Sequence, residues 1–289
     1  MDEERVSFPS LADTGHRSLD LTQPRGLRPW YPWVKREPWF PDGVATGHAD
    51  VLRTWFGAGE RPVADFNLMG GSTPAWDQKI RQCYGPLWEQ LRDGGLADWE
   101  ETPRGKVAKL ILADQLPRHI FRGQPEAFST DEIGVRLADR LAEEITGGAP
   151  LHIEEAFMIA WPWVHAENLD STYRATWWHS SLAEAARGTP YHLRALLNRY
   201  GAERHVRVIQ RFGRYPHRNV ILGRAPTAEE LRYLQHDAEL WELQQSSRHG
   251  TWYYKLKAAA FFLRTAVYLI GARDGDAITG FLGACLRSP

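Results

Sequence analysis

The sequence of 289 residues predicts an all-α protein in which successive helices form antiparallel pairs. Apolar residues recur at helical spacing from residue 47 onward, beginning with Val51, Leu52, Trp55 and Phe56. No stretch shows sustained alternation of apolar and polar residues between hairpin turns, so strands should be minor or absent. No segment rich in Pro, Gly and Ser interrupts residues 47–236, which indicates a single domain without an internal boundary.

Residues 1–49 are expected to form an arm rather than a long helix. Six prolines lie in this stretch, and proline breaks a helix. The arm is also rich in aromatic residues, in which a disordered tail would be poor. We therefore expect an extended segment that Trp30, Trp33 and Trp39 hold against the body. Covering apolar surface is the ordinary role, and lining a pocket or a homodimer contact is the alternative.

Capping signals mark the start of several expected helices. Apolar spacing predicts a helix at residues 76–91. Thr102 followed by Pro103 is typical of an N-cap with proline at the first helical position, and predicts a helix to residue 116. Ser129 and Glu132 fit a capping box for a helix to about residue 145, where two glycines follow.

The second half of the chain continues this pattern. Thr227 and Glu230 fit another capping box, for a helix to about residue 245. The core domain should span residues 50–236, and residues 237–289 should extend the same domain. The other helices are expected at residues 152–163, 172–186, 190–210, 252–270 and 277–286.

Composition and charge exclude several classes of function. The formal net charge is −1, so no global field attracts nucleic acid or an anionic membrane. The longest apolar run, residues 258–270, is shorter than the ~20 residues that a membrane span needs. Residues 1–10 lack the apolar stretch of a secretory signal. Cys83 and Cys285 have no metal-ligand or redox spacing, which favours reduced thiols and a cytoplasmic location.

Three segments concentrate chemically useful side chains at or just past a predicted helix end. Residues 114–123 are D-Q-L-P-R-H-I-F-R-G, and residues 211–219 are R-F-G-R-Y-P-H-R-N. Guanidinium groups held close together repel one another unless they are solvated, paired with carboxylates or bound to an anion. The third segment, H-A-E at residues 165–167, places a glutamate near a histidine, which can orient the imidazole and make it more basic.

Each of these features also has an ordinary structural explanation. Asp114 and Arg118 have the i,i+4 spacing of a helical salt bridge, which contributes little to stability when exposed. Arg211 and Arg214 could cap the last carbonyls of their helix, where cations are favoured. A fold that needed only caps and surface pairs would not require Arg, His and carboxylate in three separate segments, so together they favour a shared site.

Other classes of site have little support. The chain has no P-loop, no dinucleotide-binding glycine motif after a strand, no nucleophile elbow and no H-E-x-x-H. Basic residues form no stripe with interleaved aromatics, so nucleic acid is not the expected partner. His165, Glu167 and His217 could bind a metal if their loops converged, but their spacing does not require it. We therefore expect no cofactor and no metal.

Several ordered motifs resemble a bacterial family of unknown function, number 924 in the domain-of-unknown-function series. They are V-L-R-T-W-F-G from residue 51, T-P-R-G, L-I-L-A-D-Q-L-P-R-H-I-F-R-G, E-A-F-S-T-D, H-A-E, and R-F-G-R-Y-P-H-R-N-V-I-L-G-R with T-x-E-E-L after it. The resemblance covers about residues 50–235. It implies an all-helical fold of the tetratricopeptide-like class and no established activity. Ala166 stands where the family more usually has serine.

We expect a small-molecule enzyme that performs cofactor-free acid–base chemistry on an anionic substrate, which carries a carboxylate or phosphate. His217 or His165 would transfer the proton, and Glu167 or Asp114 would orient it. Guanidinium groups would hold the anion through paired hydrogen bonds, with aromatic walls around it. The expected substrate-binding residues are Arg118, Arg122, Arg211, Arg214, Arg218, Asn219, Trp161 and Trp163.

The alternative is a non-catalytic module that binds a peptide or a carboxylate. Tetratricopeptide-like stacks commonly present concave surfaces to peptides, and an Arg/His groove could hold a C-terminal carboxylate. The two hypotheses differ in the shape of the site. An enzyme needs the motif residues around one enclosed cavity, whereas a binding module would spread them along an open groove.

Overall fold

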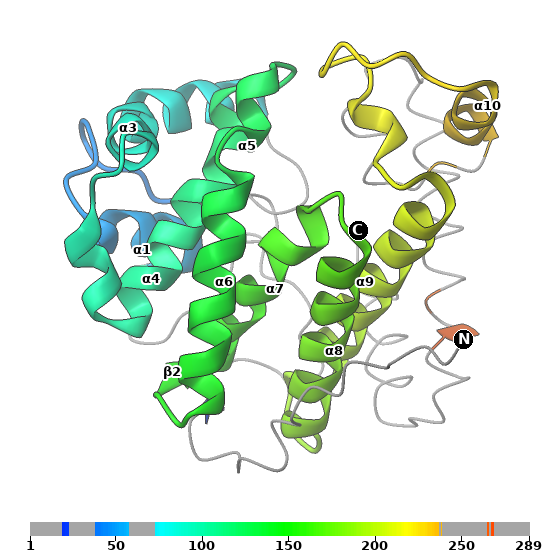
Figure 1. The fold of residues 1–289 in the computed structure, drawn as a ribbon. Coiled ribbons are helices and arrows are strands. Elements are labelled where there is room, and N and C mark those ends of the chain that lie inside the picture. Colours follow the sequence, from blue (N-terminus) through cyan, green and yellow to red (C-terminus); the bar gives the residue numbers. More distant parts are fainter. Residues whose placement is uncertain are drawn as a thin grey trace.

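The computed structural model describes residues 19–22, 38–57, 73–236, 238, 265 and 267–268, and most of them are helical (Figure 1). Within this part of the chain the strands are β1 (Leu19–Asp20) and β2 (Leu151–His152). They pair in parallel, with Leu19 opposite Leu151. The expected all-α class is confirmed.

The first half of the described chain is a group of helices around one nearly continuous helical run. That run consists of α4, a π-helical segment and α5, and both α3 and α6 pack against it. The bounds are α1 His48–Phe56, α3 Pro74–Arg92, η2 Ala97–Glu101, α4 Pro103–Leu110, η3 Ile111–Gln115 (the π segment), α5 Leu116–Ile120, η4 Pro125–Phe128 and α6 Asp131–Thr146.

The second half begins with α7, which packs between α6 and α8. Helices α8 and α9 lie along each other as a helical hairpin (Figure 1). The segment after α9, yellow in Figure 1, then leads to α10. The bounds are α7 Ile153–His165, α8 Leu169–Ala185, α9 His192–Phe212, η5 Pro216–Arg218 and α10 Ala228–His236.

Two of the expected helix starts are confirmed and one is wrong. The Thr102 hydroxyl accepts a hydrogen bond from Gly105 N, 3.0 Å away. Thr227 and Glu230 form the reciprocal capping box, at 3.1 and 2.7 Å. The Ser129 capping box is absent, because Thr130 is the N-cap of α6 and makes no side-chain cap. The Ser129 hydroxyl instead donates to the Glu126 carbonyl of the preceding 3-10 turn.

Part of the N-terminal arm is described, and it contacts the body at several places. The Thr22 carbonyl accepts a hydrogen bond from the Tyr191 hydroxyl at 3.1 Å. The same carbonyl oxygen lies 3.0 Å from His152 Nε2. The Arg53 guanidinium lies 4.1 Å from the centre of the Trp39 ring. Trp30 and Trp33, and with them the expected homodimer contact, lie outside the described residues, as do Cys285 and nearly all of residues 237–289.

One large apolar core contains side chains from α1, α3, α4, α6, α7, α8 and α9. Its largest fully buried side chains include Trp55, Trp163 and Trp178. Close packing of these rings is the main use that the described chain makes of its tryptophans. No helix in the described part of the chain combines the length and apolar character needed to cross a membrane.

Candidate functional site

The π segment, Ile111–Gln115, shapes the centre of the candidate site. A proline lacks the N–H that would bond to the carbonyl four residues earlier, so Pro117 leaves the Ala113 carbonyl without its helical donor. The Thr130 hydroxyl fills this role, with its oxygen 2.6 Å from the Ala113 carbonyl oxygen. Single-turn π segments occur frequently at functional sites, where they re-aim a side chain. Here the segment carries Asp114.

Asp114 holds the imidazole of His165, the last residue of α7. Its two carboxylate oxygens lie 2.9 and 3.0 Å from His165 Nδ1. Asp114 is fully buried, and the His165 side chain is 16% exposed. Gly134 of α6 permits this arrangement, because a Cβ there would lie 3.3 Å from Pro162 and 3.5 Å from the Asp114 Cβ. An aspartate and a histidine 51 positions apart thus form a buried pair.

Two arginines flank this pair. Arg118 makes a two-pronged contact with Asp131, at 3.0 and 3.1 Å, and also contacts Asp114 Oδ1 at 3.3 Å. Arg218 approaches Asp131 only to 3.7 Å, and its guanidinium lies over the rings of Phe128 and Tyr215 at 4.5 and 4.7 Å. We call Asp114, Arg118, Asp131, His165 and Arg218 the Arg–His cluster.

The electrostatics of the cluster favour a neutral imidazole beside an ionised carboxylate. Burial lowers the pKa of His165 below its ordinary value of 6.5, and the positive charge of Arg118 lowers it further. Burial alone would raise the pKa of Asp114, but Arg118 and His165 outweigh it and lower that pKa. A neutral ring next to a carboxylate carries its proton on Nδ1. His165 Nε2, which has no hydrogen-bond partner in the described part of the chain, is then a proton acceptor.

Several buried N–H groups on or beside the cluster have no hydrogen-bond acceptor among the described residues. They are Arg218 Nε, Arg224 Nε and the indole Nε1 of Trp161. Trp161 lies beside His165, with ring centres 5.7 Å apart. Buried donors are normally satisfied, and each one left over costs about 1–3 kcal/mol. Orphaned donors of this kind suit a site that binds an acceptor-rich ligand.

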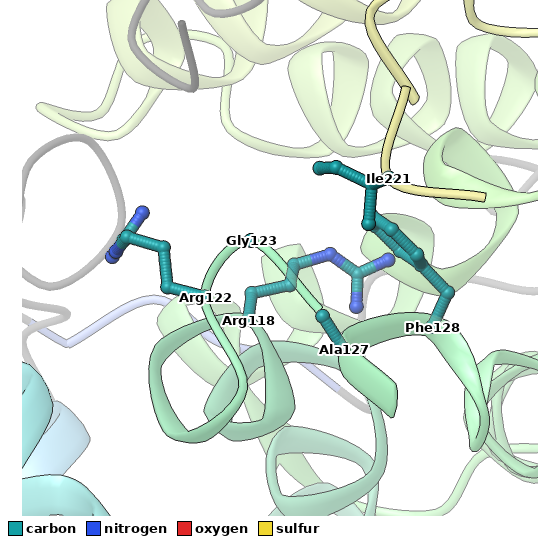
Figure 2. Close-up of a pocket in the computed structure, with 6 residues that line it drawn as sticks. All are labelled: Arg118, Arg122, Gly123, Ala127, Phe128 and Ile221. Carbon is teal, nitrogen blue, oxygen red and sulfur yellow. The ribbon is translucent and has the colours of Figure 1, made fainter. Parts of the chain in front are cut away.

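A small pocket of about 50 Å³ opens on the arginine side of the cluster. It is lined by two arginines, by Phe128, and by Ile221 from the segment after α9. Figure 2 shows the Arg118 side chain extending toward Phe128 while Arg122 extends in the opposite direction. A volume of this size accommodates a few waters or one small anion with a short apolar group.

Glu167 and His217 lie near the cluster and have other contacts. Glu167 Oε1 accepts hydrogen bonds from Tyr215 N at 2.7 Å and from Arg224 Nη2 at 2.9 Å. Glu167 therefore anchors the segment after α9 to the end of α7 rather than orienting a histidine. The His217 ring lies 5.7 Å from the Tyr215 ring. No contact joins either residue to His165 in the described part of the chain.

The remaining predicted site residues fall into four places. Arg211 and Arg214 pair with Glu229 and Glu230 of α10, at 2.8 and 2.7 Å, and so hold that helix. Trp163 is in the core, where its indole donates to Asp139 at 2.9 Å. Arg122 lines the pocket and pairs with Asp77, at 2.5 Å. Asn219 is buried beside Arg218, and its side-chain Oδ1 has no partner in the described chain.

Sequence reasoning missed Asp131, Phe128, Ile221 and Arg224. All four lie in motifs that carried the family resemblance, E-A-F-S-T-D and V-I-L-G-R. Asp131 could have been noticed in the sequence, because a carboxylate is favoured in the first turn of a helix and can pair there with an arginine. All four residues lie outside the runs of histidine and arginine at residues 114–123 and 211–219.

The possibility of a metal bound by His165, Glu167 and His217 has no geometric support in the described residues. Glu167 is held by Arg224 and His165 by Asp114. Across the described ranges, no three His, Cys, Asp or Glu side chains are grouped closely enough to hold a metal ion.

Comparisons with known proteins agree with the motifs. The model of a family described as "Bacterial protein of unknown function (DUF924)" matches residues 51–238. A solved structure of a protein of unknown function, ATU0120 from Agrobacterium tumefaciens, is similar to this chain at 28% sequence identity and a TM-score of 0.53. The likeness covers 65% of this chain and 96% of that one. No curated protein matches the sequence.

Proposed function

Because this chain belongs to the bacterial family of unknown function DUF924, we propose its function from its own geometry. It is an enzyme that binds a small carboxylate- or phosphate-bearing molecule and performs cofactor-free acid–base chemistry on it, in the cytoplasm. One observation carries the proposal. The Asp114–His165 pair lies beside Arg218, a buried guanidinium that makes no side-chain hydrogen bond to a described residue.

The proposed roles follow from the contacts of each side chain. Asp114 fixes the imidazole with Nδ1 as donor, so that His165 Nε2 takes a proton from the substrate or returns one to it. Arg118 and Arg218 hold the anionic group, since charged hydrogen bonds from guanidinium to an oxyanion are strong and directional. Phe128 and Ile221 contact the apolar part of the substrate. This assignment gives the proton-transfer role to His165 and leaves Arg211 and Arg214 outside the binding set.

Anion binding can be tested with propionate and inorganic phosphate as probes. Titration followed by NMR of the arginine Nε–H groups should show shifts at Arg118 and Arg218. Arg218→Ala should weaken binding about 10- to 150-fold, the equivalent of the ~1.5–3 kcal/mol of a charged hydrogen bond. Arg211→Ala is the matched control and should bind as the wild type does. Equal binding by Arg218→Ala and the wild type would end the proposal.

Catalysis needs a second test. The protein is incubated in D2O with a mixture of small carboxylic acids and phosphate esters, and proton NMR follows consumption, new products and deuterium incorporation. The wild type should change at least one compound, and His165→Gln should abolish the change while it still binds propionate. Unchanged compounds with wild-type protein, despite anion binding, would refute the enzyme hypothesis.

The second candidate is a non-catalytic module that binds a peptide or carboxylate. One observation favours it: Arg118, Arg122 and Phe128 line the pocket, but His165 and Asp114 do not. The tetratricopeptide-like stack that the family resemblance implies would suit such a role. This candidate predicts that peptides with a free C-terminal carboxylate bind more tightly than the same peptides with an amidated C-terminus, and that no compound is converted.

A further inference from the structure

The Arg–His cluster is balanced in charge when His165 is neutral. Two guanidiniums, Arg118 and Arg218, face two carboxylates, Asp114 and Asp131. Arg122, which lines the pocket together with Arg118, has its own carboxylate partner in Asp77. An anion that enters this buried site therefore brings a negative charge that no resident charge offsets, and an unbalanced buried charge is costly.

A proton on His165 would restore the balance. The positive charges of Arg118 and Arg218 are among the causes that disfavour a protonated imidazole, together with burial. An anion bound to those guanidiniums would offset the same charges. By linkage, a ligand that makes protonation of His165 easier must itself bind more tightly when His165 is protonated.

We propose that the cluster binds a small monoanion, a carboxylate rather than a phosphate dianion, and that binding takes up one proton from solvent on His165 Nε2. This inference rests on the proposed anion site, narrows its ligand class, and leaves His165 the proton-donor role of the two proposed above. A monoanion with the proton leaves the cluster neutral. A dianion would leave one negative charge uncompensated in a site whose members are almost fully enclosed.

Every element around His165 contributes a group that bears on this proton. The π segment provides Asp114, α5 provides Arg118, α6 provides Asp131, and the turn after α9 provides Arg218. From α9, His205 also faces His165. Burial lowers the pKa of His205 to about 3, and burial raises that of Asp131 above its ordinary value of 3.8. His205 is therefore neutral near neutral pH. Both oxygens of Asp131 contact Arg118, whereas His165 Nε2 has no partner among the described residues, so we assign the proton to His165.

The affinity of the wild-type protein for propionate should depend on pH in a defined direction. The dissociation constant stays low below the pKa of His165 in the free protein. It then increases up to tenfold per pH unit until the pH reaches the pKa of His165 in the complex. Calorimetry in two buffers of different ionisation enthalpy should count about one proton taken up per propionate within that window. Methanesulfonate, which stays ionised throughout, should give the same slope, and sulfate should bind more weakly than methanesulfonate.

Two variants assign the proton to a residue. His165→Gln should bind propionate with no pH slope, whereas His217→Gln should keep the wild-type slope.

Propionate binding by the wild type without proton uptake would overturn this inference and leave the anion site standing. Sulfate binding tighter than methanesulfonate would overturn the monoanion assignment. Failure of every anion to bind the wild type would remove the proposed function as well. The number of protons that the wild-type protein takes up per propionate tests the inference even if a variant does not fold.

Discussion

The described part of the chain contains two aspartate–histidine–arginine groups, and adjacent residues of α5 belong to different ones. Arg118 is in the Arg–His cluster, while His119 joins Asp77 at 2.9 Å and Arg122 completes that second group. The Arg118 side chain is 14% exposed and Arg122 is 42% exposed. The first group also has a second guanidinium, Arg218. The two groups therefore have the same residue types and similarly enclosed aspartates and histidines, and they differ in the exposure and number of their arginines.

The difference teaches that a histidine next to a carboxylate is not by itself a sign of function. The Asp77 group joins α3 to α5 across their contact, which is a structural role. The Arg–His cluster adds a guanidinium without hydrogen bonds and an imidazole nitrogen without a partner in the described chain. Buried donor and acceptor groups that the protein itself leaves without a partner are the better indicator of a ligand.

The largest expected difference between the groups is in stability. Asp114→Asn should lower the free energy of unfolding by about 3 kcal/mol, because it removes a charge from a buried network. Asp77→Asn should cost about 1 kcal/mol, since water screens its half-exposed arginine partner. Urea unfolding of the two variants measures both values. Similar losses would show that burial does not distinguish the groups.

Loss of the Thr130 hydroxyl, which bonds to the π segment of the Arg–His cluster, should have the next largest effect on the free energy of unfolding. Thr130→Val removes the hydroxyl that donates to the Ala113 carbonyl and accepts from the Trp88 indole at 3.2 Å. Two buried polar groups then lose a partner, at a cost of about 2 kcal/mol. Thr146→Val is the control, because its hydroxyl only adds a second bond to a helical carbonyl of the same helix. Chemical denaturation should find less than ~0.5 kcal/mol there.

Acid should weaken the fold through the buried imidazoles. The folded-state pKa of His165 lies below 6.5, and burial lowers the pKa of His179 and of His205 to about 3. Below pH 6.5 the unfolded chain binds these protons and the folded chain does not, so stability is full above 6.5 and falls as pH decreases. Each histidine contributes up to about 1.4 kcal/mol per pH unit. His165→Gln should flatten the measured dependence, and a wild type of constant stability from pH 7 to 5 would contradict this.

The smallest expected effect is in the second group. Arg122→Lys keeps the positive charge and loses the two-pronged contact with Asp77, so it should cost no more than about 1 kcal/mol. The same change at Arg118 should cost more, because that side chain contacts two buried carboxylates. Thermal melts of both lysine variants provide the comparison. A larger loss from Arg122→Lys would reverse the order of the two groups.

Local signals predicted the helices well, because capping and apolar spacing depend on neighbours in sequence. Thr102 and Thr227 cap as expected, since nothing competes for their hydroxyls. Ser129 failed because it ends the 3-10 turn η4 with helical backbone angles (φ −69°, ψ −18°), whereas an N-cap residue is normally extended. The π segment was not predicted, and Pro117 was the available clue that the helix could not run undisturbed to residue 116 and beyond.

The candidate site was predicted only in part, because its pairings are long-range. Asp114 and His165 were both expected, but their direct contact spans 51 positions and depends on how α6 and α7 pack. Arg211 was expected at the anion, yet the turn after α9 brings Glu229 beside it. The sequence shows both residues and does not show which of the many carboxylates lies opposite each guanidinium.

The anchor formed by Glu167 has a consequence for the order in which the chain acquires its site. Asp114, Arg118 and His165 are all synthesised before the segment that Glu167 holds. A nascent chain ending at residue 212 would have the Asp114–His165 pair and only one of the two guanidiniums. Arg218 and the pocket wall at Ile221 arrive together when Tyr215 and Arg224 bind Glu167. The second positive charge is thus added to a pair of carboxylates that is already in place.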